Sequence, residues 1–112
     1  MDILNISIVT YNNLKTQVIN VIKSCLQSDI VRKLYIIDNS SRNDLKILSN
    51  IDNRIIYIFN NANLGFGKAH NIALRKSIEE NIPYHLVLNP DVYFEKGVLE
   101  ELYNFMENNK DV

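Results

Sequence analysis

A single carboxylate, that of Asp91, follows the apolar run 86–88 and the dipeptide Asn89-Pro90. The run predicts a buried strand, and the proline has to end it because proline has no N–H to give to a strand ladder. In open α/β sheets, ligands bind above the carboxyl ends of the strands. A lone carboxylate on a turn at that edge suits a divalent cation that also binds substrate phosphates. The segment therefore predicts a ligand site that includes Asp91.

Polar residues also follow three other apolar runs, at residues 10–13, 38–41 and 60–67. The carboxyl ends of parallel strands meet at one edge of a sheet, so we expect all four polar segments to converge in space. Four polar loops at one edge are the layout expected of a nucleotide site.

Asp38 allows two interpretations. Its carboxylate could accept hydrogen bonds from a base N–H or a ribose hydroxyl. Alternatively, it could stabilise its own loop through an Asx turn with Ser40 or Ser41.

Residues 65–67 (Gly-Phe-Gly) precede a helix that we expect to begin near Lys68. Glycines let a backbone approach a ligand closely, and a helix N-terminus favours phosphate. The alternative is a flexible strand-to-helix loop. The dinucleotide fingerprint G-x-G-x-x-G is missing after the first strand, where residues 11–13 read Tyr-Asn-Asn. The sequence therefore argues against a nicotinamide or flavin enzyme.

Other residues with reactive side chains have simpler explanations. His70 could reach a phosphate from its helix, but a lone helical histidine more often packs or faces solvent. His85 lies in a predicted strand and reads as structural, and Tyr57 reads as a core or rim residue. Cys25 lies on an apolar helix stripe and reads as a small buried hydrophobe.

The elements that must position these residues alternate along the chain. Four runs rich in β-branched and aromatic residues predict strands at residues 3–10, 34–38, 55–60 and 84–89. The last three are nearly continuous, which is typical of strands covered on both faces. The first alternates between apolar and polar residues, so we expect it to lie near an edge or to carry a polar face.

Helical spacing separates and follows the strands. Apolar residues recur at three- and four-residue spacing within residues 14–25, 45–51, 69–73 and 98–106. Asn12 or Asn13 could cap the first of these helices, and Ser41 or Asn43 the second. The order β-α-β-α-β-α-β-α predicts an α/β fold with a mostly parallel sheet and crossover helices on both faces.

Composition narrows the class of protein. The chain has 112 residues, one cysteine and a net charge of −1, with its basic residues scattered. We expect one domain and no nucleic-acid partner. The sequence contains no long apolar stretch and no basic leader, which predicts a cytoplasmic protein, with peripheral association at the inner face of a membrane still compatible.

Four motifs then occur in a fixed order: SIVTYN at residues 7–12, IIDNSS at 36–41, NLGFG at 63–67 with Asn71 beyond it, and LNPD at 88–91. This ordered set resembles glycosyltransferase family 2, nearest its rhamnosyltransferase-like branch. The resemblance implies the nucleotide-diphospho-sugar transferase (GT-A, Rossmann-like) fold and metal-assisted, inverting transfer of a hexose or deoxyhexose, as in polysaccharide biosynthesis. The implied partners are a UDP- or dTDP-linked sugar and a glycan or lipid-linked acceptor.

The resemblance also implies roles for individual residues at the nucleoside end. Thr10, Tyr11 and Asp38 would line the nucleoside pocket, with Asp38 facing the base. Asn63, Gly65 and Asn71 would form the wall near the ribose and diphosphate.

At the metal end, Asn89-Pro90-Asp91 takes the place of the family's D-x-D motif. Asp91 would hold Mg²⁺ or Mn²⁺ against the diphosphate. Asn89 departs from the motif: it can bind a ribose hydroxyl but adds no charge, so metal affinity without nucleotide should be weak. The catalytic base that the family requires would lie beyond Val112.

The chain stops directly after a helix, which favours a truncated, donor-binding N-terminal part (residues 1–112) of a longer enzyme. Such a part should bind nucleotide weakly, transfer nothing and expose apolar surface that promotes self-association. Three alternatives stay open: a sugar-nucleotide nucleotidyltransferase, a receiver-like signalling domain, and a nucleotide-binding module without catalysis.

Overall fold

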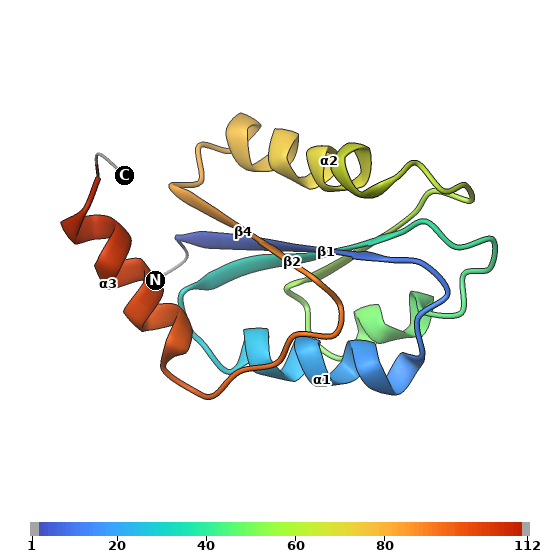
Figure 1. Cartoon of the computed structure of the whole chain (residues 1–112), viewed down its shortest axis with the longest axis horizontal. Coiled ribbons are helices and arrows are strands. Elements are labelled where there is room, and N and C mark those ends of the chain that lie inside the picture. Colours follow the sequence, from blue (N-terminus) through green and yellow to red (C-terminus); the bar gives the residue numbers. More distant parts are fainter. Residues whose placement is uncertain (1–2, 111–112) are drawn as a thin grey trace.

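Four parallel strands form one sheet in the order β3-β2-β1-β4 in the computed structural model, which describes residues 3–110 (Figure 1). The strands are β1 (Leu4–Thr10), β2 (Val31–Asp38), β3 (Ile55–Phe59) and β4 (Tyr84–Leu88). All three strand pairings are parallel. The predicted parallel α/β sheet is confirmed.

Helices cover both faces of this sheet. Helix α1 (Lys15–Leu26) and the short 3₁₀ helix η1 (Lys46–Asn50) lie on one face, and α2 (Phe66–Glu79) lies on the other (Figure 1). Helix α3 (Val98–Asn108) lies at the end of the sheet where β1 begins. Within residues 3–110, no helix combines the length and apolar character needed to cross a bilayer.

The side chains of the strands alternate between the two faces. Ile6, Ile8, Leu34 and Ile36 are fully buried in the larger core cluster, which includes the apolar stripe of α1. On the other face, Tyr35 and Ile37 pack in a smaller cluster with the alanines of α2, whose small side chains let that helix lie close to the sheet.

Strand β1, in which apolar and polar residues alternate, does not lie where that pattern predicted. The strand is central, not at an edge, and its polar residues Asn5 and Ser7 are fully buried. Strands β2, β3 and β4 were expected to be covered on both faces. Of these three, only β2 is buried on both faces over most of its length. The edge strands β3 and β4 are mostly half-buried, and Val87 of β4 is exposed.

The predicted start of one strand was wrong, and so were the predicted helix caps. Strand β2 begins at Val31, earlier than expected, because its polar start is paired with β1 from Leu4 onward. Arg32 and Lys33 in that start are also paired with Glu80. Helix α2 begins at Phe66, within two residues of the start expected near Lys68.

Neither predicted pair of capping residues caps a helix. The N-caps of α1 and η1 are Leu14 and Leu45, and neither makes a side-chain capping hydrogen bond. Asn13, one of the residues expected to cap α1, uses its side-chain oxygen to accept the N–H of Tyr11 instead.

Candidate functional site

The four polar segments follow the carboxyl ends of the four strands. From β1 the chain moves outward to β2 and β3 and then returns to the opposite side of β1 for β4. The point where strand order reverses therefore lies between β1 and β4. In open α/β sheets this switch point is where ligands bind. Here the segments on its two sides contain Tyr11 and Asp91.

Asp38 closes β2 and is fully buried. Its Oδ1 accepts hydrogen bonds from the Thr10 hydroxyl at 3.1 Å and from the Ser40 N–H at 3.0 Å. The second of these bonds is the predicted Asx turn, which is confirmed with Ser40. Thr10 is also fully buried, so both side chains lie beneath the loops and not on the surface of the edge.

Tyr57 supplies a third donor to the same carboxylate. Its hydroxyl donates to Asp38 Oδ2 at 2.6 Å. Burial, followed by the hydrogen bond and charge of Asp38, raises the pKa of the Tyr57 hydroxyl, which therefore stays protonated and able to donate. This role was not predicted, because a half-buried tyrosine in a strand gives no sign of a polar partner 19 residues away.

Asn39 connects the loop after β2 to the loop after β3. Its side-chain oxygen accepts a hydrogen bond from Asn60 at 2.8 Å, and its Nδ2 donates to the Gly65 carbonyl at 3.3 Å. Asn63 Oδ1 accepts from the same Nδ2 at 3.4 Å and from the Gly65 N–H at 3.0 Å. Asn39 is 2% exposed. Its connecting role was not predicted, although it stands inside the IIDNSS motif.

The start of α2 carries the expected glycine loop. Gly65 has φ +83°, a conformation that favours glycine, and a Cβ added at either Gly65 or Gly67 would meet nothing within 4 Å. The need for glycine is thus conformational at Gly65. The first N–H groups of a helix have no partner inside it, which leaves them available to an anion. Asn71, further along α2, is exposed.

The segment after β4 stands apart from the other three. Asn89 and Asp91 are exposed. Beyond them the chain turns back along α1 toward α3 (Figure 1). On this path the Phe94 N–H donates a hydrogen bond to Oγ of Ser24, a residue of α1, at 3.0 Å. Gln27 Nε2 donates to the Phe94 carbonyl at 3.1 Å. This segment is therefore attached to α1.

The carboxylates at this edge limit how a cation could bind. In the described part of the chain, no three His, Cys, Asp or Glu residues gather as a metal site. Asp38 already accepts three donors and Asp44, in the segment after β2, is paired with Arg42, whereas Asp91 is exposed at the switch point. One carboxylate fits a cation whose other ligands come from phosphates and water.

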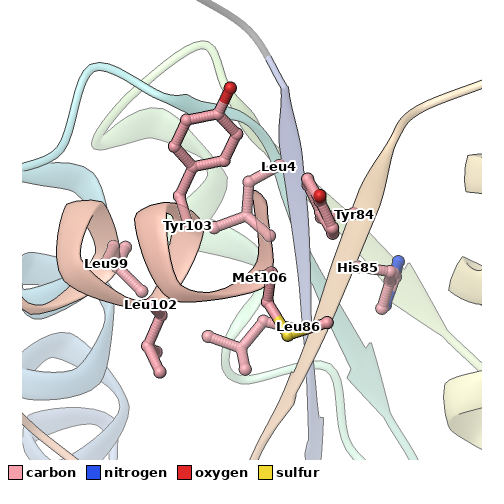
Figure 2. A pocket seen from close by; sticks show the side chains of 8 residues that line it. All are labelled: Leu4, Tyr84, His85, Leu86, Leu99, Leu102, Tyr103 and Met106. Carbon is pink, nitrogen blue, oxygen red and sulfur yellow. The ribbon is translucent and has the colours of Figure 1, made fainter. Parts of the chain in front are cut away.

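A cavity of about 210 Å³ lies at the opposite end of the sheet (Figure 2). It is mainly apolar and opens between α3 and the first residues of β1 and β4, with Leu4, Leu86, Leu99, Leu102, Tyr103 and Met106 in its lining. Its position at the amino ends of the strands separates it from the polar loops.

A buried polar network links β1, β4 and α2. Ser7 Oγ lies 2.7 Å from His70 Nδ1 and 2.8 Å from His85 Nε2. Ser77 Oγ lies 2.7 Å from His85 Nδ1 and accepts a hydrogen bond from Asn5 at 2.9 Å. Burial lowers the pKa of His70, and burial together with His70 lowers the pKa of His85 to about 4. Both histidines are packing residues, as expected.

Comparisons with known proteins agree with this architecture. The family model described as "Glycosyl transferase family 2" matches residues 6–112. The chain is 34% identical over 79 residues to the low-salt glycan biosynthesis hexosyltransferase Agl10 of Haloferax volcanii, a match that covers 70% of this chain and 25% of that protein. The chain thus spans about a quarter of this curated relative.

Two crystal structures of S. aureus TarS show the same fold. One has a TM-score of 0.76 at 20% identity and covers 98% of this chain and 20% of that chain. The other, of TarS 1-349, has a TM-score of 0.74 at 19% identity and covers 98% of this chain and 33% of that one. Because the family model covers nearly all of the chain, this protein belongs to glycosyltransferase family 2.

Proposed function

We propose that this chain is the donor-binding part of a glycosyltransferase and binds the nucleoside diphosphate of an activated sugar. The observation that carries the proposal is the switch point between β1 and β4, with a polar loop on one side and the exposed Asp91 on the other. Ligand binding at such a point follows from strand topology, independently of the family match. The whole enzyme would move a hexose or deoxyhexose to a glycan or lipid-linked acceptor.

At the nucleoside end, Tyr11 offers an exposed aromatic ring on which a base can stack. Thr10 and Asp38 lie beneath it and fix the loop. Asn63 and Gly65 form the adjoining wall, which is braced by Asn39.

At the diphosphate end, Asp91 would hold Mg²⁺ or Mn²⁺ together with the phosphate oxygens. Such a cation neutralises the negative charge that a nucleoside diphosphate leaving group gains. Asn89, exposed on the same turn, offers an amide to a ribose hydroxyl, and Asn71 on α2 lies beyond the glycine loop. The catalytic base is assigned to no residue of this chain.

Calorimetric titration of the chain with UDP and dTDP, with and without Mn²⁺, tests the proposal. We expect nucleotide binding that Mn²⁺ strengthens, and a loss of at least about tenfold in the Mn²⁺-dependent affinity in Asp91→Asn. Asp29→Asn is the matched control, because Asp29 is an exposed aspartate before β2, at the opposite edge of the sheet. No binding by the unaltered chain would refute nucleotide binding. Equal affinities of Asp91→Asn and the unaltered chain would refute the metal role alone.

A further inference from the structure

Tyr57, Asp38 and Thr10 come from three adjacent strands and carry their side chains on the α1 face of the sheet. We propose that Tyr57 is a positioning residue for the donor nucleotide, acting through the Asp38 carboxylate on the loops that follow β1 and β2. This inference rests on the proposed function. It adds a residue that no motif of the sequence indicates.

The hydrogen bonds around Asp38 make Tyr57 hard to replace. Asp38 Oδ1 accepts from two donors, the Thr10 hydroxyl and the Ser40 N–H. Within the described residues 3–110, Asp38 Oδ2 accepts from one donor, the Tyr57 hydroxyl. Asp38 is fully buried, so water does not take the place of a missing donor without a local rearrangement. A buried carboxylate oxygen that loses its donor is costly, and the side chain will reorient to recover one.

Two hydrogen bonds would transmit a reorientation of Asp38 to the proposed nucleoside pocket. The Ser40 N–H is held by Asp38 Oδ1, and Ser40 Oγ accepts the Asn12 N–H at 2.7 Å. Asn12 has φ +54°, a left-handed conformation that asparagine adopts more readily than most residues, and its N–H is held by this bond to Ser40. Tyr11, the exposed aromatic residue of the pocket, directly precedes it. Tyr57 thus supports the β1 loop although it lies outside that loop.

The chain contains a matched control for the chemistry of this bond. Tyr84 in β4 donates its hydroxyl to Glu107 Oε2, also at 2.6 Å, at the opposite end of the sheet. Tyr57→Phe and Tyr84→Phe each remove one tyrosine-to-carboxylate hydrogen bond and leave the ring in place. A general loss of stability should follow from both changes, but a change in the loops only from the first.

Two measurements on the 112-residue chain test the proposal. Amide hydrogen exchange reports on the loops without any ligand: we expect the Ser40 and Asn12 amides to exchange at least about tenfold faster in Tyr57→Phe and to be unchanged in Tyr84→Phe. Calorimetry with UDP and Mn²⁺ reports on binding: we expect roughly tenfold weaker affinity in Tyr57→Phe only. Combining Tyr57→Phe with Asp38→Asn should weaken binding no more than Asp38→Asn alone, because both changes remove the same support.

The outcomes separate the two proposals. If the unaltered chain does not bind UDP, the proposed function fails, and the role of Tyr57 in nucleotide binding fails with it, whatever the exchange shows. If UDP binds but Tyr57→Phe has normal exchange at Ser40 and Asn12 or normal affinity, the positioning role is overturned and the proposed function stands. Additive effects of Tyr57→Phe and Asp38→Asn on affinity would also overturn it.

Discussion

Acidification should destabilise this fold through His85. Its two ring nitrogens lie 2.8 Å from Ser7 Oγ and 2.7 Å from Ser77 Oγ, so both of its hydrogen-bond partners are neutral. Burial, with the neighbouring His70, lowers its pKa from 6.5 to about 4. In the unfolded chain the pKa returns to its ordinary value, so the unfolded state binds more protons between these two values.

The sign and size of the effect follow from this difference. Stability is complete above the unfolded pKa near 6.5 and falls as the pH drops toward about 4, where the folded state also becomes protonated. For one histidine with these two pKa values, the free energy of unfolding at pH 5 is lower than at pH 7 by about 2 kcal/mol. His70, whose pKa is lowered by burial, adds a loss of the same sign.

Urea denaturation at pH 7, 6 and 5 measures this loss. The chain has two histidines, so the variant with both His70→Gln and His85→Gln has none left to titrate. We expect its free energy of unfolding to be nearly constant between pH 7 and 5, because Asp52, Glu80 and Glu107, whose pKa values are lowered, lose their charge at more acidic pH. His85→Gln alone should remove about 2 kcal/mol of the pH dependence. An equal loss in the unaltered chain and the double variant would refute the reasoning.

Two further predictions concern the glycine loop and the buried thiol. Gly65→Ala should lower the free energy of unfolding by about 1–3 kcal/mol in urea titrations, because Gly65 has φ +83° and ψ 167°. Gly67→Ala is the control: Gly67 lies within α2 with open space for a Cβ, so this change should not lower the free energy of unfolding. Equal losses in the two variants would contradict the argument. Burial raises the pKa of the Cys25 thiol to about 12, so the folded chain at pH 8 should react with a disulfide reagent only as fast as it unfolds, and rapid reaction without denaturant would show that the thiol is accessible.

The fold was predictable where local pattern and tertiary environment agree. The apolar stripe of α1 and the continuous run in β2 specify their elements without distant partners, and strict alternation of the elements specifies a parallel sheet. Prediction was wrong where a distant partner changes the meaning of a residue. The polar start of β2 is a strand because it pairs with β1, and its residues Arg32 and Lys33 bind Glu80, which is 47 or more residues away; the local sequence shows neither contact.

In the candidate site, too, contacts between near neighbours in the sequence were predictable and contacts between distant residues were not. The Asx turn of Asp38 depends on a neighbour two residues away and was expected, whereas the donor from Tyr57 is 19 residues away and was not. The polar face of β1 was visible in the sequence, but its burial was not, because the partners of Ser7 are 63 and 78 residues distant. The assignment of Asp91 to a metal stays a prediction. The same holds for the residues assigned to the nucleotide, which are Thr10, Tyr11, Asp38, Asn63, Gly65, Asn71 and Asn89.

The separate attachment of the segment after β4 has a mechanical consequence. The loops that follow β1, β2 and β3 are joined to one another by hydrogen bonds, so they behave as one wall, while Phe94 ties the opposite side to Ser24 and Gln27. Helix α1 is thus connected to both sides of the switch point, because its start is bonded to the β1 loop through Asn13 and Gln17 and its end to the segment after β4. Any shift of α1 against the sheet would therefore move both sides of the switch point together.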